Sequence, residues 1–219
     1  MPGPKRTARP YHHGDLLNAC IDGAEELLAA EGPGAVTLRA VAERAGVSHN
    51  APYRHFATKR DLLAAVAVRA FRRLEERVRS GVGERRGRFQ RLESGCLAYA
   101  DFALEQPARY ALMFSSELSE ADYPELAAAR AEAFQVLVEE LAGSGKAAED
   151  LALAIWSALH GLVSLRLQSG RSRTVDPLSI SANIRRVLVV LTGNNRGQAE
   201  LPRVPRTLMQ VDNTRRGVG

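Results

Sequence analysis

Apolar residues recur every three or four positions along most of this 219-residue chain, and no segment alternates strictly between apolar and polar residues. The clearest stripe begins after residue 14 and places one apolar residue at every fourth position: Leu16, Cys20, Ala24 and Leu28. This spacing puts apolar side chains on one face of an α-helix, whereas a half-buried strand requires alternation. We therefore expect an all-α fold. The first helix should end at Gly32-Pro33-Gly34, because glycine favours helix ends and proline cannot continue a helix.

Two threonines mark the starts of further helices. Thr37 and Thr58 can each accept a hydrogen bond from an exposed amide of the following turn, and Asp61 is well placed to complement the amides after Thr58. The helix after Thr58 should reach Ser80, where Gly81-Val82-Gly83 ends it. Later helices are expected at about 85–105, 107–115, 124–142, 147–168 and 177–191.

Composition divides the chain into four segments. Residues 1–12 are rich in proline, glycine and basic residues without helical periodicity, and we expect them to form a flexible basic arm. Residues 193–219 also have no helical stripe, and we expect disorder there. Between them, we expect an N-terminal module of three helices at 13–60. The long helix joins it to a larger helical domain at 61–192.

The basic excess lies at the two ends of the chain. The net charge is +5, with 13 basic and 9 acidic residues among the first 80 but 12 and 14 in residues 81–192. From Thr37 to Arg60, five basic residues accompany a single acidic one, Glu43. A short positive segment in an otherwise balanced protein favours phosphate binding, and a solvated basic face without a partner is the alternative.

Several classes of protein are disfavoured by what the sequence lacks. No run approaches the roughly 18 apolar residues of a membrane span, and no apolar signal region follows the basic start, so we expect a cytoplasmic protein with no membrane partner. Cys20 and Cys96 form no CxxC or disulfide framework, and we expect two unreactive thiols and no metal, with an oxidant-sensing thiolate at Cys96 as the alternative. No Gly-rich phosphate loop, GxSxG motif or paired-carboxylate site stands out, so we expect neither an enzyme nor a cofactor.

Residues 37–60 have the layout of a helix-turn-helix. A short helix after Thr37 is followed by a Gly46 turn, and Ser48 can cap a next helix beginning at His49. In a helix-turn-helix the second helix enters the major groove of DNA. Pro52 removes an amide from this second helix, so the helix should be distorted or should start late.

These residues carry a resemblance to a known family. The run from Tyr11 to Val66 resembles the N-terminal DNA-binding domain of TetR-family transcriptional regulators, through the following residues: Thr37, Ala42, Ala45-Gly46-Val47-Ser48, Tyr53, His55, Phe56, Lys59 and Leu62-Leu63. The stretch from Trp156 to Leu162 is similar to the Trp…His-Gly (WHG) signature of one group of C-terminal domains in this family.

The resemblance implies which residues contact DNA phosphates. Tyr53, His55 and Lys59 lie where the family meets phosphates, and each side chain can donate a hydrogen bond. Thr37 and Ser48 stand at helix starts, where a hydroxyl and backbone amides can also meet a phosphate. Capping alone is the alternative role of these two hydroxyls.

Three further residues are candidates for reading bases. The resemblance places Arg39 where the family can carry a base-reading arginine, and a bidentate arginine is the commonest specific contact to guanine. Asn50 lies at the groove-facing start of the next helix and can bridge N6 and N7 of adenine, while its neighbour His49 can contact a base or a phosphate. We expect Val47 and Phe56 to be core residues.

The remainder of the chain is expected to bind a partner subunit and an effector, as the resemblance implies. The helices at about 147–168 and 177–191 are assigned to a two-fold homodimer interface, with the internal core of a monomer as the alternative. Effector pockets are mainly apolar with a few polar groups. The candidate pocket residues are Tyr99, Phe102, Met113, Phe114, Trp156 and His160, and the alternative is plain core, which is the more common role of aromatic and methionine residues at helical spacing.

The sequence hypothesis is therefore a homodimeric repressor of transcription that a small molecule releases from DNA. A dimer presents two reading helices about 34 Å apart and predicts a near-palindromic operator. The effector would favour a dimer geometry that no longer fits adjacent grooves, and the helix at 58–80 would carry the movement. The alternative is a helical adaptor that binds protein through its basic end, which predicts no salt-sensitive operator binding.

Overall fold

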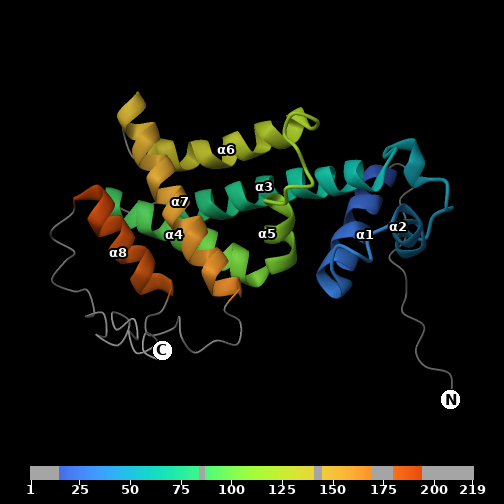
Figure 1. The fold of residues 1–219 in the computed structure, drawn as a ribbon, viewed down its shortest axis with the longest axis horizontal. Coiled ribbons are helices and arrows are strands. Elements are labelled where there is room, and N and C mark those ends of the chain that lie inside the picture. Colours follow the sequence, from blue (N-terminus) through green and yellow to red (C-terminus); the bar gives the residue numbers. More distant parts are fainter. Residues whose placement is uncertain (1–14, 84–86, 141–144, 169–179, 194–219) are drawn as a thin grey trace, which may run out of the picture. The chain divides into compact units, whose positions relative to one another are not determined.

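The computed structural model describes residues 15–83, 87–140, 145–168 and 180–193. These residues form helices and no strands, which confirms the all-α prediction (Figure 1). The helices are α1 (Leu16–Glu31), α2 (Leu38–Ala45), the 3-10 helix η1 (Pro52–Arg54), α3 (Lys59–Val82), α4 (Arg88–Glu105), α5 (Pro107–Met113), α6 (Pro124–Glu140), α7 (Lys146–Gln168) and α8 (Ile180–Thr192). The expected basic arm, the tail after residue 193 and the expected helix start at 177–179 lie outside the described residues.

The chain divides into two compact units. The first comprises the residues up to Arg77 together with Glu105–Val136, so it holds α1, α2, η1, most of α3, α5 and most of α6. The second comprises Val78–Leu104 and the residues from Leu137 onward, and it holds the end of α3, α4, α7 and α8. The predicted boundary between residues 60 and 61 stays a prediction.

The N-terminal part of the first unit is organised around α1. Its predicted apolar stripe is buried at Cys20, Ala24 and Leu28, where α1 packs against α2 and η1. The tight turn after α2 is made by Gly46, whose φ of 69° lies in the left-handed region that favours glycine. The amide of Val47, which is half-buried, donates to the carbonyl of Ala42 at 3.0 Å and fixes the chain's exit from α2.

The second helix of the helix-turn-helix differs from the expectation of a start at His49. The amide of Ala51 donates to the carbonyl of Ser48 at 2.9 Å in a turn, and only Pro52–Arg54 are helical, as one turn of 3-10 helix. Pro52 stands at the first helical position, where no amide is required. The expected late start is confirmed. Ala51 rather than Ser48 precedes the helical turn, and no side chain caps it.

Gly81 does not end α3, which continues through it to Val82. In the second unit, a Cβ atom on Gly81 would lie 2.7 Å from the Cβ of Ala98 and 3.2 Å from the carbonyl oxygen of Ser94. Real Cβ atoms do not approach so closely, so the glycine allows α3 and α4 to pack in close contact. The helix ends instead at Gly83, whose φ is 49°.

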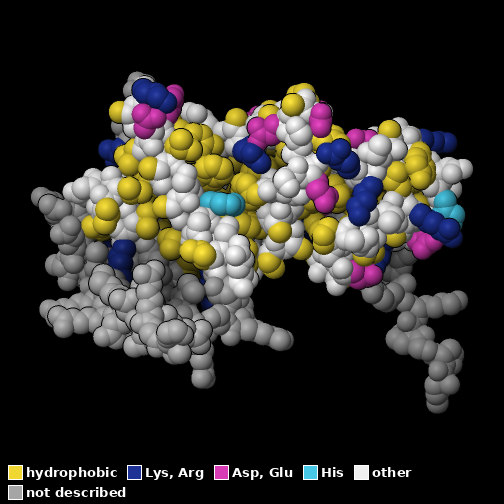
Figure 2. Space-filling model, in the orientation of Figure 1, with side chains coloured by type: hydrophobic (Ala, Val, Ile, Leu, Met, Phe, Trp, Pro, Cys, Tyr) yellow, Lys and Arg dark blue, Asp and Glu magenta, His cyan; other side chains and the backbone are white. Residues whose placement is uncertain are grey.

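The second unit pairs α7 with α8. Ile155, Leu159 and Val163 of α7 are buried, as are Ile184 and Leu188 of α8. Hydrophobic side chains also lie on the surface over these two helices (Figure 2). The large ones exposed there are Leu153, Leu165 and Val190.

α7 also corrects an expectation about membrane spans. Among the helices of the described residues, it is the one with the length and apolar composition to cross a bilayer, and 22% of its most apolar window is buried. The prediction that no segment approaches a span was therefore wrong for α7. Length and composition alone are weak evidence, because a core or interface helix of a soluble protein meets the same criterion.

Candidate nucleic-acid interface and effector residues

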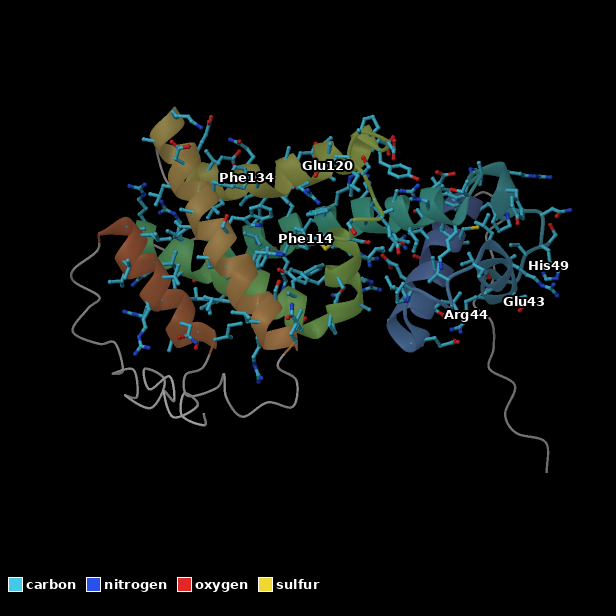
Figure 3. The ribbon with its side chains drawn as sticks, viewed as in Figure 1. Glu43, Arg44, His49, Phe114, Glu120 and Phe134 are labelled. Atoms are coloured by element: carbon cyan, nitrogen blue, oxygen red, sulfur yellow. The ribbon has the colours of Figure 1, made fainter. Side chains whose placement is uncertain are left out.

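The eight candidate DNA-binding residues all lie between the start of α2 and the start of α3, in the first unit. Basic and histidine side chains gather on the surface of the module that carries α2 and η1 (Figure 2). Figure 3 shows His49 at the outer end of this module. Seven of the eight are exposed and Lys59 is half-buried, the exposed ones being Thr37, Arg39, Ser48, His49, Asn50, Tyr53 and His55.

Thr37 acts as the expected cap of α2. Its backbone is extended, and its Oγ1 accepts a hydrogen bond from the amide of Ala40 at 3.1 Å. The capping role is thus confirmed. A capped helix start still presents free amides to an anion. The contact of Thr37 with a phosphate is therefore compatible with its capping role and stays a prediction.

Arg39 has an anionic neighbour on the same helix. Its Nε donates to Oε1 of Glu43 at 3.4 Å, and both side chains are exposed. An exposed pair at this spacing is worth about 0.3 to 0.5 kcal/mol. The pair can therefore open at little cost if Arg39 turns to a base.

Lys59 makes a contact that the sequence did not indicate. Its Nζ donates to the carbonyl oxygen of Pro33 at 2.7 Å, which ties the start of α3 to the turn after α1. A phosphate contact by the Lys59 ammonium would be made in addition to this bond or in exchange for it.

Two of the five basic residues between Thr37 and Arg60 belong to the scaffold. Arg44 pairs with Glu26 and Glu31 of α1, at 3.3 and 3.6 Å. Arg60 donates through Nε to the carbonyl of Glu117 at 3.1 Å, and through Nη2 to the same oxygen. Arg54 is exposed between Tyr53 and His55. Sequence reasoning counted its charge without assigning it a contact, although its position in η1 makes it a further candidate.

The start of α3 has a reciprocal cap. The amide of Thr58 donates to Oδ2 of Asp61 at 2.8 Å, and the amide of Asp61 donates to Oγ1 of Thr58 at 3.2 Å, which confirms the predicted capping pair. The hydrogen bond from the Thr58 amide is the main cause that lowers the pKa of Asp61 below its usual value. The hydroxyl of Tyr123 also donates to Oδ1 of Asp61, at 3.1 Å.

A buried carboxylate joins α1 to the rest of the first unit. Glu25 is the one buried charged residue among those described, with 3% of its surface exposed. Its carboxylate accepts hydrogen bonds from Arg69 and Arg73 of α3 and from Arg109 of α5. Sequence reasoning missed this cluster, because the partners lie 44, 48 and 84 positions away.

The six candidate effector residues are divided between the two units. Tyr99, Phe102, Trp156 and His160 belong to the second, where the Tyr99 hydroxyl lies 3.3 Å from Nδ1 of His160. The Trp156 and His160 rings have centroids 5.9 Å apart. In the first unit, Met113 is buried, and the half-buried Phe114 contacts Phe71 and Tyr110 edge-on.

Both cysteines are buried thiols, as expected. Burial, together with the smaller effect of the nearby Glu93 carboxylate, raises the pKa of Cys96 to about 12. Burial alone raises the pKa of Cys20. Because the thiolate is the reactive form, these environments make both side chains poor nucleophiles at neutral pH.

Two family models match the chain. Residues 21–66 match a model described as "Bacterial regulatory proteins, tetR family", and residues 92–191 match one described as "Tetracyclin repressor-like, C-terminal domain". A curated relative, the uncharacterized HTH-type transcriptional regulator Rv0681 of Mycobacterium tuberculosis, is 31% identical over 67% of this chain and 68% of its own length.

A second curated relative and a solved structure are also similar to this chain over most of its length. The uncharacterized HTH-type transcriptional regulator YobS of Bacillus subtilis is 29% identical over 80% of this chain and 92% of its own length. A solved protein of unknown function from Rhodococcus sp. RHA1 superposes with a TM-score of 0.71 and 27% identity. That alignment covers 85% of this chain and 98% of the other.

Proposed function

Because this chain belongs to the TetR family of bacterial transcriptional regulators, we propose that it is a homodimeric repressor that a small molecule releases from a near-palindromic operator. It is a helix-turn-helix regulator that binds DNA, and the family is not enzymatic, which confirms the expectation from the sequence. A soluble bacterial regulator of this kind works in the cytoplasm. Association with the nucleoid when bound to DNA is part of the proposal.

The observation that carries the proposed DNA interface is the clustering of its candidate residues on one exposed module. Tyr53, His55 and Lys59 would position the module on phosphates, with Arg54 as an added contact. The hydroxyl groups of Thr37 and Ser48 would also contact phosphates of the DNA backbone. Arg39 and Asn50 would read bases, and His49 would contact a base or a phosphate. His49 and Asn50 would make these contacts from a turn rather than from a helix.

The proposed dimer interface lies on α7 and α8. These helices cover one another's buried faces within the protomer, and yet Leu153, Leu165 and Val190 are left exposed. Contiguous exposed apolar surface is typical of protein interfaces. A second copy of this chain would cover that face. The two helix-turn-helix segments of the dimer, residues 37–60 of each chain and here called the reading modules, would then lie about 34 Å apart. Membership of the WHG group of C-terminal domains also stays a proposal, carried by Trp156 to Leu162.

The proposed switch is a change in the population of dimer geometries. An effector bound among aromatic residues would favour a geometry that no longer fits two adjacent grooves, and it can do so only by its difference in affinity for the two states. Tyr99, Phe102, Trp156 and His160 would supply aromatic and polar groups in the second unit, and Met113 and Phe114 would supply apolar side chains in the first.

The test is a selection of genomic fragments by the purified full chain over a salt series, followed by footprinting and by light scattering. A short inverted repeat that survives competitor DNA, bound by a dimer, is the expected result. A monomer at operator-binding concentrations would contradict the dimer. Binding that is blind to sequence at every salt concentration would contradict the operator and would favour the adaptor alternative.

A further inference from the structure

Arg130 of α6 places its guanidinium group over two aromatic rings in the first unit. The guanidinium carbon lies 5.6 Å from the ring centroids of both Phe71 and Phe114. The two rings meet edge-on, with centroids 5.6 Å apart, and Tyr110 packs on Phe114 at 5.0 Å. This is an aromatic cluster with one cation in it, and a cation over ring faces is attracted by their electron density.

The hydrogen bonds of Arg130 are incompletely satisfied. Nη1 pairs with Oε1 of Glu120, and Nη2 donates to the carbonyl of Met113 at 3.3 Å. Nε is buried and has no hydrogen-bond partner within the part of the chain that the structure describes. A guanidinium presents a planar fork that suits both oxygens of one carboxylate, so a single-nitrogen contact to Glu120 leaves much of this capacity unused.

Glu120 is a replaceable partner. Figure 3 shows Phe114 at the end of α5 and Glu120 in the segment that leads into α6. Glu120 lies in a turn outside the helices, and its side chain is 41% exposed although the Oε1 that faces Arg130 is buried. Its carboxylate can therefore turn into water and regain hydration there, with the pairing to Arg130 as the interaction that is lost. Another carboxylate could then take its place on Arg130.

The segment that carries Glu120, residues 114–123, also holds the start of α3. The carbonyl of Glu117 accepts from Arg60, and the hydroxyl of Tyr123 donates to Asp61 at 3.1 Å. Arg60 and Asp61 stand directly after Lys59 and take part in the first turn of α3, next to the proposed DNA contacts. One short segment thus bonds both the cation in the aromatic cluster and the base of the reading module.

We propose that Arg130 binds the carboxylate of a small apolar acid, aliphatic or aromatic, which displaces Glu120, and that this displacement loosens residues 114–123 from Arg60 and Asp61 and lowers operator affinity. The apolar part of the acid packs against the half-buried ring of Phe114, which the buried rings of Phe71 and Tyr110 contact edge-on. This inference rests on the proposed function for its readout and gives the class and the route of action of the effector. By linkage, operator DNA lowers the affinity for the acid by the same factor.

The first experiment measures binding to the full chain without DNA, by calorimetry and ligand-observed NMR. The probes are octanoate and benzoate, with octanamide and benzamide as neutral controls of the same shape. We expect the acids to bind at least about tenfold more tightly than the amides, because only the acids form the charge-assisted pair with Arg130.

Two variants and a matched control assign this preference. Arg130→Met should reduce it to within about threefold, because the charge is gone while the side chain stays long and apolar. Glu120→Gln should tighten acid binding, since the competing internal carboxylate is removed. Arg91→Met is the control: Arg91 is 33% exposed against 32% for Arg130, and it pairs with Glu140 in the second unit. This control should leave the preference unchanged.

The binding results can overturn the proposal in three ways. The first is equal affinity of the wild type for acid and amide. The second is an acid preference that is unchanged in Arg130→Met. The third is the absence of acid binding in the wild type and also in Glu120→Gln. If Arg130→Met fails to fold, Arg130→Lys replaces it, because lysine keeps the charge and loses the planar fork. An unchanged acid affinity in that variant would equally exclude the guanidinium as the anchor.

The second experiment separates this inference from the proposed function. Release of the operator by octanoate or benzoate is measured by fluorescence anisotropy, after the operator has been footprinted without any ligand. Acid-dependent release that is lost in Arg130→Met is the expected result. An operator that stays bound while the acid occupies its site would overturn the coupling and leave the regulator intact. Acid binding without any operator would instead contradict the proposed function.

Discussion

The Nη1 of Arg73 donates to both carboxylate oxygens of Glu25, at 2.9 and 2.8 Å, although 48 residues separate the two in the chain. Arg69 adds a bond at 3.1 Å, and Arg109 adds one at 3.3 Å. The carboxylate on α1 is therefore held by α3 and α5 together. Since α1 is the scaffold of the reading module, this cluster fixes the module on the rest of the first unit.

Removing the charge of Glu25 should destabilise the protein strongly. Glu25→Gln leaves three arginines without their buried counter-ion, and breaking a buried ion pair costs about 3 to 5 kcal/mol. Urea denaturation followed by circular dichroism measures the change. The control is Glu26→Gln, whose carboxylate is exposed and pairs with Arg44, and which should cost less than about 1 kcal/mol. Equal effects of the two substitutions would show that the Glu25 cluster does not stabilise the fold.

Lys59→Ala should weaken binding to all DNA sequences alike. The loss of one phosphate contact lowers the slope of log affinity against log salt by about 0.9. Anisotropy titrations at four salt concentrations, with operator and with random DNA, measure that slope. A loss confined to the operator would mean that Lys59 acts through its bond to the Pro33 carbonyl and the shape of the module, rather than through a phosphate.

Arg39→Ala and Asn50→Ala should relax the choice of base at particular operator positions. Each good base contact contributes about 1 to 3 kcal/mol of discrimination. Competition against operators with single base changes locates those positions, and Glu43→Gln serves as a control that keeps Arg39 and removes its anionic neighbour. If both alanine variants lose affinity equally for every sequence, these residues position the module and do not read it.

The capping carboxylate of Asp61 should make stability depend on acidity. The pKa of Asp61 is lowered in the folded protein, mainly by the hydrogen bond from the Thr58 amide, so the ionised form favours folding. Its contribution is complete above the ordinary aspartate pKa of about 3.9 and is lost as the pH falls through the lower folded value. Asp61→Asn should flatten the fall in unfolding free energy below pH 4, measured by urea melts. Asp101→Asn, at an exposed position, is the control.

Gly81→Ala should destabilise the second unit. A methyl group there would lie 2.7 Å from the Cβ of Ala98, and such overpacking costs about 1 to 3 kcal/mol, more than the gain in helix propensity. Thermal unfolding measures the loss. Gly34→Ala adds a methyl group where nothing lies within 4 Å and serves as the control. An unchanged melting temperature in Gly81→Ala would mean that α3 and α4 separate at no cost.

Local rules predicted the features that depend on neighbouring residues. Hydrogen bonds within one helical turn account for the caps at Thr37 and Thr58, and the missing amide of Pro52 accounts for the late start there. The spacing of apolar residues along the first helix accounts for its buried stripe. The family resemblance, which rests on spacings within residues 11–66, was equally accessible from the sequence.

Features that depend on residues far apart in the chain were not predicted from the sequence. The role of Gly81 is set by α4, and the partners of Glu25 and Lys59 lie tens of positions away. From the sequence alone, a glycine near the end of an apolar stripe predicts a helix end. Its other role, which is to let a second helix pack closely, is visible only when the position of that helix is known. The apolar character of α7 was recognised from the sequence, but the length of its most apolar window was underestimated, because leucines exposed on its surface add to the apolar residues of its buried face.

The short turn of 3-10 helix at Pro52–Arg54 has an evolutionary consequence. Residues 48–50 precede it in an exposed turn and carry none of the buried contacts that hold α1 to α2. Under the proposed DNA interface, substitutions at these positions would alter which bases are preferred with almost no change in folding free energy. A duplicated copy of the gene could acquire a new operator through a few such changes, while the body of the protein continued to fold and to sense the same compound.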